Sequence, residues 1–201
     1  MGIPAHVAGF QSNGYKTQNA ATVIQFNLPG VNGQRLGLSE LLYLAAATAH
    51  TATLMVPGSS AGCKNSASAA AAAGQKVINV VSDPLDPSGN AAAAADWVAY
   101  QDASGTWNFD TVNGVVGKAV TMTNNIVAAG IAAGGLVRFF GVAGDLNGAQ
   151  LSLPASSTTE YGNGRLVWVH PDRSEPAILQ INNITNAGFH LNSLFLYLDN
   201  K

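Results

Sequence analysis

The sequence predicts a mainly β protein, built as a β-sandwich or a barrel-like domain. Three observations carry this prediction. Short runs rich in β-branched and aromatic residues recur along the 201 residues, turn-forming Gly, Pro, Asn and Asp separate these runs, and no long stretch has the period of an amphipathic helix. About eight to ten short strands at this spacing are typical of sandwiches and barrels.

The strongest strand pattern is a β-meander within residues 97–141. Apolar and polar residues roughly alternate along its first hairpin, and turn-forming residues separate its later strands. Its predicted strands are residues 97–101, 107–111, 119–123 and 136–140, with turns at 102–105 and 112–114. Residues 116–118 could form a third turn.

Further strands are predicted outside the meander. Each is a short alternating or β-branched run next to Gly, Pro or Asn. They cover residues 22–28, 51–56, 76–81, 165–170, 176–181 and 194–198, and residues 151–154 begin another extended piece.

Short Ala-rich helices are predicted at residues 67–73 and 91–95. Alanine has the best intrinsic helix propensity, although runs of this length need tertiary packing to persist. Ser39 could cap a further short helix, so residues 36–55 are open to helical and extended interpretations.

Residues 1–21 are predicted to form an extended N-terminal arm, and residues 22–201 one β-rich globular domain. The arm is rich in Gly, Asn and Gln, and such a segment can become ordered by lying on a neighbouring subunit. Phe10 and Tyr15 are its predicted subunit contacts. Whether residues 1–50 form a separate arm or belong to the core is left open.

Charged residues make up 10% of the chain, against about 25% in typical soluble domains. Interface cores are depleted of charge, so this composition suggests that much of the surface meets other subunits. The alternative is an Ala- and Gly-rich domain that stays soluble alone. Nine basic and eleven acidic residues, without a basic cluster, argue against nucleic-acid binding.

The sequence favours neither a disulfide framework nor a membrane span. Cys63 is the single cysteine, so no internal disulfide can form, and a buried thiol is expected there. The N-terminus lacks the basic and apolar regions of a secretory signal. Residues 36–56 are the one candidate span, but Glu40, His50 and several threonines make a bilayer placement costly, so we expect a buried segment.

One stretch, residues 58–62, matches the G-x-S-x-G pattern of a hydrolase nucleophile elbow. Ser60 would be the nucleophile, with Asp145 or Asp172 as the acid and His170 or His190 as the base. The surrounding chain does not alternate strands with long helices as an α/β-hydrolase does. We therefore predict no catalytic residues and no enzyme activity.

No metal or cofactor site is predicted. The four histidines, His6, His50, His170 and His190, lack metal-ligand spacing. Four aspartates, Asp83, Asp86, Asp96 and Asp102, lack the spacing of a calcium loop, so a turn role is expected for them. Asn183 begins a formal glycosylation sequon, which we expect to be unused.

The aromatic residues invite a carbohydrate-binding interpretation, because exposed rings can stack on sugars. In the strands of a sandwich they are more often core residues. The core interpretation is preferred for the following residues: Trp97, Tyr100, Trp107, Phe139, Phe140, Tyr161, Trp168 and Tyr197.

Four segments together resemble a known family. They read DWVAYQDASGTWNFDTVNGVVGKAVTMTN, IAAGGLVRFFGVAGD, GRLVWVHPDRSEPAILQI and SLFLYLDN. This order of strand and turn residues resembles that of the decoration or cement proteins of tailed-bacteriophage capsids. The resemblance covers residues 96–201 and, more loosely, residues 51–63.

The resemblance implies a non-enzymatic β-rich virion protein, often a homotrimer, on the outer surface of the head. It would be made in the host cytoplasm and would clamp neighbouring copies of the major capsid protein. Neither nucleic acid nor membrane is an expected partner. Two alternatives stay open: a phage tail or receptor-binding β-sandwich that recognises host glycan, and a hydrolase that uses Ser60.

Overall fold

A computed structural model describes residues 6–18, 24–44, 49–142, 148–153, 159–161, 166–182 and 189–199. Every regular element in these ranges is a β-strand, which confirms the predicted mainly β class. The chain divides into two compact units. Unit 1 comprises Met1–Met55 and Gly148–Lys201, and unit 2 comprises Val56–Asn147.

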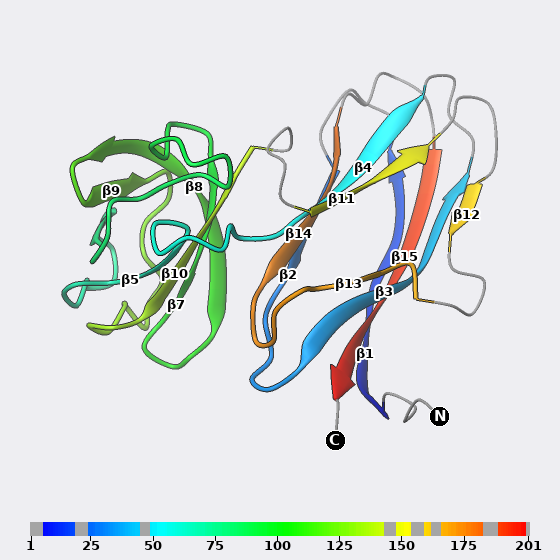
Figure 1. Cartoon of the computed structure of the whole chain (residues 1–201), viewed down its shortest axis with the longest axis horizontal. Helices are drawn as coiled ribbons and strands as arrows, with labels where there is room; N and C mark the ends of the chain where they lie inside the picture. The colour runs from blue at the N-terminus through cyan, green and yellow to red at the C-terminus, as the bar shows by residue number, and fades with distance from the viewer. Residues whose placement is uncertain are drawn as a thin grey trace. The chain divides into compact units, whose positions relative to one another are not determined.

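Unit 1 holds two antiparallel sheets (Figure 1). The first contains, in spatial order, β1 (His6–Gln18), β15 (Phe189–Asp199), β3 (Arg35–Leu44) and β12 (Thr159–Tyr161), and β13 (Trp168–Val169) also pairs with β3. The second contains β11 (Gly148–Leu153), β4 (His50–Met55), β14 (Ala177–Asn182) and β2 (Ile24–Leu28).

The strand order of unit 1 is that of an eight-stranded jelly roll. Counted along the unit, β1, β2, β3, β4, β11, β12, β14 and β15 are its first to eighth main strands. The two sheets then have the orders 1-8-3-6 and 5-4-7-2. Strands that are distant in sequence therefore pair, as when two Greek keys wrap two sheets around one core.

Each sheet of unit 1 contributes an apolar face to the core. In the second sheet, Leu54 pairs with Leu179 and Leu179 pairs with Phe26, and all three side chains are buried. In the first sheet, Leu36 and Leu38 of β3 are buried, and their spacing of two residues places them on one face of the strand. This arrangement confirms the sandwich interpretation for unit 1.

Unit 2 is inserted between β4 and β11 and contains a six-stranded antiparallel sheet. Its spatial order is β5 (Lys64–Ser66), β10 (Leu136–Gly141), β7 (Trp97–Gln101), β8 (Trp107–Val116), β9 (Ala119–Met122) and β6 (Val77–Asn79). The first half of β8 pairs with β7 and its second half pairs with β9. The predicted meander is confirmed for β7, β8 and β9, whereas β10 pairs with β7 and does not follow β9. The turn predicted at residues 112–114 is wrong, because these residues lie within β8, and the chain turns at residues 117–118.

The outer strands of this sheet, β5 and β6, also meet each other. Ala67 and Val80, just beyond them, form an antiparallel bridge. It is flanked by hydrogen bonds from Ser68 N to Asn79 O, 2.7 Å, and from Val81 N to Ser66 O, 3.0 Å. The six strands therefore close on themselves, so the barrel interpretation holds for unit 2.

A single apolar cluster fills unit 2. Its members come from all parts of the unit between residues 67 and 139, and include Ile78, Val98, Val120, Met122 and Phe139. Because these buried residues belong to unit 2 alone, the unit has a hydrophobic core of its own.

The predicted Ala-rich helices are wrong. Residues 67–73 and 91–95 contain no helix, and instead form isolated bridges: Ala67 to Val80, Ala71 to Ile131 and Ala91 to Leu85. Hydrogen bonds to neighbouring segments replace those that a helix would form within itself. Alanine runs of this length are too short to be helical without packing, so the bridges prevail.

Ser39 caps no helix, because it lies within β3, where residues 35–44 pair with β15. The segment predicted as an arm also contains a strand. Over His6–Gln18 the chain forms β1, which pairs with β15 from His6 opposite Asp199 to Gln18 opposite Phe189. Two register shifts interrupt this pairing.

Candidate interaction surfaces

The sheet of β11, β4, β14 and β2 contains no Asp, Glu, Lys or Arg. Its inner face is apolar except for His50, and its outer face carries amides and hydroxyls together with Met55 and Ile178. Met55, Ile178 and Thr53 are buried. One row crosses all four strands: Gln150 pairs with Thr53, Thr53 with Gln180, and Gln180 with Gln25. An uncharged polar face costs less to desolvate than a charged one, which suits contact with another protein surface.

Gln180, at the centre of this row, is 8% exposed. Its Oε1 atom is buried and has no hydrogen-bond partner. Its neighbour Gln25 is engaged on the same face, because its Nε2 atom donates to Asn27 Oδ1 at 2.6 Å. Gln150, at one end of the row, is exposed, as are Asn27, Thr51 and Ser152 on the same face.

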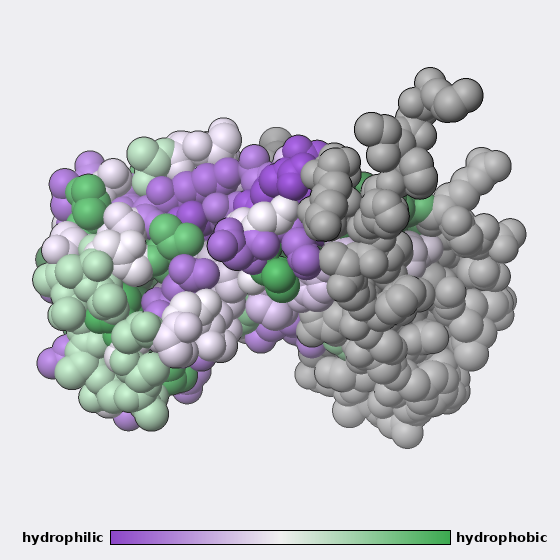
Figure 2. Space-filling view, turned by 90° about the horizontal axis from the view of Figure 1, so that it is seen from below, coloured by the Kyte–Doolittle hydropathy of each residue, from purple (hydrophilic) through white to green (hydrophobic). Residues whose placement is uncertain are grey.

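A second uncharged surface lies on unit 2. Residues 68–70, 72–73, 128–129 and 132–134 are exposed and consist of Ser, Ala and Gly. The bridge between Ala71 and Ile131 holds these loops together. Figure 2 shows hydrophobic residues gathered over part of the surface of unit 2, at the left of the view.

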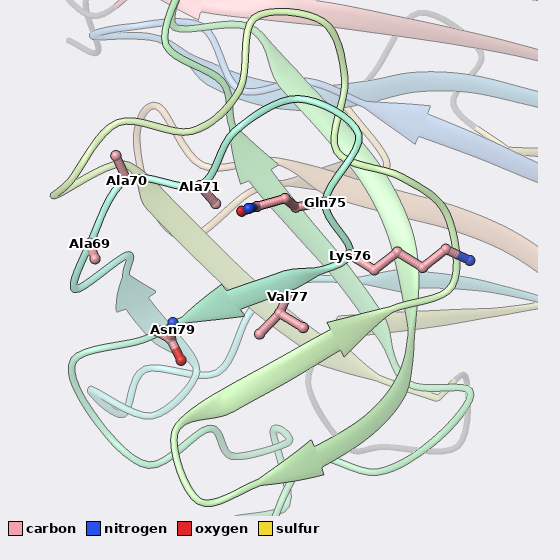
Figure 3. A pocket seen from close by; sticks show the side chains of 7 residues that line it. All are labelled: Ala69, Ala70, Ala71, Gln75, Lys76, Val77 and Asn79. Carbon is pink, nitrogen blue, oxygen red and sulfur yellow. The ribbon is translucent and has the colours of Figure 1, made fainter.

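One of these loops borders a hollow of about 330 Å³ (Figure 3). Its lining residues are Ala69, Ala70, Ala71, Gln75, Lys76, Val77 and Asn79. Figure 3 shows Gln75 extending toward Ala71 and Lys76 directed away from the alanines. The Lys76 ammonium donates to Thr123 O at 2.8 Å, so the one charged group of the lining is directed to a neighbouring backbone.

The predicted subunit contacts, Phe10 and Tyr15, both lie on β1. Their backbones pair with Leu196 and Asn192 of β15. Their side chains lie outside what the structure describes, so the contact stays a prediction.

Ser60 has a structural role in a turn. Its Oγ donates to Cys63 Sγ at 3.1 Å and accepts from Cys63 N at 3.2 Å. The two glycines of the motif are explained by close packing, because a Cβ on Gly58 would lie 2.5 Å from Cys63 Sγ and one on Gly62 2.5 Å from Leu85 Cγ. Turn formation and packing therefore account for the elbow-like pattern.

The residues predicted to complete a catalytic triad are not brought to Ser60 within its unit. His170 and His190 belong to unit 1, whereas Ser60 belongs to unit 2. Asp172 lies beside His170, and its N–H donates to His170 Nδ1 at 3.0 Å. Asp145 lies outside the described residues. Cys63 is buried, as expected, and its thiol donates to Asp86 O at 3.1 Å.

Three of the predicted turn aspartates accept hydrogen bonds from nearby backbone. Asp86 Oδ1 accepts from Asn90 N at 2.9 Å, Asp96 Oδ2 from Ala93 N at 2.7 Å, and Asp102 Oδ1 from Ser104 N at 2.9 Å. Asp83 is exposed. Among the described residues, no group of three His, Cys, Asp or Glu side chains could hold a metal ion.

The aromatic residues of unit 2 mostly belong to its interior. Tyr100, Trp107, Phe139 and Phe140 are buried, which confirms their core interpretation, and Trp97 is half-buried. The Arg138 guanidinium carbon lies 5.8 Å from the centre of the Trp107 ring, within cation–π range.

The aromatic residues of unit 1 include two that are half-buried, Trp168 and Tyr197. The Tyr197 hydroxyl donates to Pro29 O at 3.2 Å, and burial raises the pKa of this phenol. Tyr161 lies on β12, and its side chain is outside the described part of the chain.

No helix in the described residues is long and apolar enough to cross a membrane. Comparison with protein-family models gave no match. Comparison with curated proteins also gave no match. Among solved structures, the chain is similar to VP17, a capsid protein of bacteriophage P23-77, at 10% identity and a TM-score of 0.23. The match covers 96% of this chain and 100% of VP17.

Proposed function

We propose that this chain is a structural protein of a bacteriophage particle. The observation that carries the proposal is the strand order of unit 1, because jelly rolls recur in viral capsid proteins. A fold alone does not define a function. The uncharged sheet face of unit 1 and the Ala-rich loops of unit 2 add support, since both suit burial against other subunits in a shell.

The finer proposal is a decoration or cement protein on the outer surface of a tailed-phage head. It rests on the resemblance of residues 96–201 to that family. The mechanism is binding alone: copies that bind the assembled shell, and not its dissociated subunits, stabilise the shell by mass action. The proposed partners are the major capsid protein and two further copies of this chain, with Phe10 and Tyr15 of β1 at subunit contacts.

Two experiments test these proposals in sequence. Mass spectrometry of purified virions of the encoding phage is expected to find the chain in many copies, and its absence would overturn the structural role. Purified chain is then mixed with heads from which it has been removed. Co-sedimentation with these heads and a higher disruption temperature would support the decoration role, whereas closed shells formed by the chain alone would replace it with a shell-building role.

A second candidate function is recognition of host glycan by a phage tail or receptor-binding protein. Lectin domains also use the jelly roll, and the amides of Gln25, Asn27 and Gln150 could hydrogen-bond to sugar hydroxyls. Binding of purified chain to host surface polysaccharide, lost in Gln150→Ala, would favour this function. Binding to heads without binding to polysaccharide would exclude it.

A further inference from the structure

Two loops of unit 1 are joined around His170. Residues 170–176 connect β13 to β14, and residues 29–34 connect β2 to β3. Backbone bonds run from His170 N to Leu36 O at 2.7 Å and from Ser174 N to Gln34 O at 2.8 Å. Gly33 takes part twice: its N–H donates to Ser174 Oγ, and its carbonyl accepts from Arg173 Nη1, both at 2.8 Å.

The His170 ring is fully buried, and both of its nitrogens have backbone partners. The Asp172 N–H lies 3.0 Å from Nδ1, so Nδ1 must accept and carries no proton. Pro176 O, 3.2 Å from Nε2, can only accept, so Nε2 must carry the proton. The closed junction therefore requires the neutral Nε2–H tautomer.

A second proton on this ring would destroy the junction geometry. It would place an N–H at Nδ1 against the N–H of Asp172, so the Asp172 donor would lose its acceptor. The backbone of this loop is also strained, because Ser174 has φ +63°, a conformation uncommon outside glycine. Opening the loop would expose the ring to water and relieve this strain.

We propose that His170 is an acid-sensitive latch, which holds residues 170–176 against residues 29–34 when neutral and releases them when protonated. This inference rests on the ring contacts and does not depend on the proposed virion role. The device is local, because the junction bonds given above connect these two loops and the start of β3. Tyr197 of β15 also donates to Pro29 O, at the start of the 29–34 loop.

The surroundings of the ring have opposing effects on the pKa of His170. Burial lowers the pKa of His170, against the opposing influence of the Pro176 carbonyl and of the Asp172 and Glu175 carboxylates. The neighbouring cations in sequence are Arg173 on the same loop and Arg35 on β3, while β14 carries no charged residue. The open state protonates near the ordinary pKa of about 6.5, and the closed state only at lower pH.

The direction of the pH effect follows from this difference. Between the two pKa values the open state binds more protons than the closed state, so acid favours opening. The closed junction has its full stability above about pH 6.5, and loses up to about tenfold in its closing equilibrium per pH unit below that value.

Amide hydrogen exchange from pH 7.5 to pH 4.5, corrected for intrinsic rates, tests the latch in the whole chain. Protection of the Gly33, Asp172 and Ser174 amides is expected to fall at least tenfold across this range. The Val80 and Ile131 amides of the barrel are expected to keep their protection over the same pH range, because unit 2 contains no histidine. Constant protection at the junction, or equal losses in both units, would overturn the proposal.

The variant His170→Asn provides the matched test. Its amide oxygen can accept from Asp172 N–H as Nδ1 does, but it cannot take up a proton in this range. Junction protection in the variant is expected to be independent of pH between 7.5 and 4.5. A pH step that persists in the variant would assign the effect to another group. Nitrogen chemical shifts of the wild-type ring would separately contradict the latch if they showed the Nδ1–H tautomer.

Discussion

Met55 and Gly148 face each other across the pair of strands β4 and β11, at the two ends of the inserted segment. The chain therefore leaves unit 1 after Met55 and returns to it at Gly148, at paired positions of two antiparallel strands. Each side of this junction has its own sheets and buried residues. Such an arrangement is typical of domain insertion at a hairpin.

Removal of residues 56–147 is expected to leave unit 1 folded. Replacing them with an Asn-Gly dipeptide would join Met55 to Gly148 through a two-residue hairpin turn. Residues 56–147 expressed alone are also expected to fold, because the apolar cluster of unit 2 is complete within them. The dispersion of amide signals in NMR spectra tests the deletion variant and the isolated fragment. A spectrum typical of an unfolded chain for either one would show that the two units depend on each other for folding.

The closure of the barrel predicts a contrast between two adjacent valines. Val80→Ala removes two buried methyl groups at the bridge to Ala67, and is expected to lower the free energy of unfolding by about 1–3 kcal/mol. Val81→Ala changes a side chain that is 52% exposed and should cost less than about 0.5 kcal/mol. Urea unfolding followed by tryptophan fluorescence measures both. Equal losses would contradict closure at this point.

Gly30 is expected to be intolerant of a side chain. A Cβ there would overlap the Ser174 carbonyl, whose carbon would be 2.6 Å away, and would lie 2.8 Å from the Glu175 carbonyl carbon. Gly30→Ala should therefore destabilise unit 1 by about 1–3 kcal/mol through overpacking. Gly114→Ala, where the added atom meets nothing within 4 Å, is the control. Thermal unfolding that is unchanged in Gly30→Ala would be inconsistent with this packing.

Local patterns made β7, β8 and β9 predictable, because each of these strands pairs with the next one along the chain. The pairing of β10 with β7 was not predictable in this way, because no turn joins the two strands. The jelly-roll order was not predictable in the same way. The pairing of β1 with β15 joins residues almost a chain length apart, and no local signal specifies it. The alanine runs misled for a related reason, since bridges such as Ala71 to Ile131 override intrinsic helix propensity.

The positions of the candidate surfaces were not predictable from the sequence. Low charge over the whole chain predicted subunit contact, which stays a prediction, and the row from Gln150 to Gln25 exists only because four strands align in register. The elbow-like sequence around Ser60 shows the converse. Two glycines required by packing against Cys63 and Leu85 produced a pattern that looks catalytic.

Asp102 is expected to make stability depend on acid. Burial raises its pKa, but hydrogen bonds from Ser104, Thr106 and Asn108 together outweigh this effect, so the pKa lies below its ordinary value. A lowered folded pKa gives stability that is present above the unfolded value, near pH 4, and is lost as pH falls through the folded value. Asp102→Asn should be less stable than wild type at pH 7 and nearly equal to it at pH 2. A difference that stays constant in calorimetric melts over this range would refute the assignment.

Gln180 is expected to tolerate an apolar replacement in the isolated protein. Its Oε1 is buried without a partner, so Gln180→Met removes an unsatisfied group at similar volume. The free energy of unfolding should fall by less than about 1 kcal/mol, or rise. Chemical denaturation provides the value, with exposed Gln150→Met as the reference. A loss well above 1 kcal/mol would mean that the Gln180 amide is important for folding.

A charge placed on the uncharged sheet face is expected to impair incorporation into the particle without impairing folding. Thr51 is exposed on this face, where it pairs with Ser152 and Asn182. Thr51→Lys should leave the melting temperature nearly unchanged, because surface substitutions cost little. Burial of the new ammonium against a partner would cost at least about 1.4 kcal/mol, a tenfold loss of binding. Asn113→Lys places the same charge at an exposed position of β8 in unit 2 and is the matched control. Virion incorporation, measured by quantitative mass spectrometry, should fall for Thr51→Lys alone, and equal incorporation of both variants would remove this face from the proposed interface.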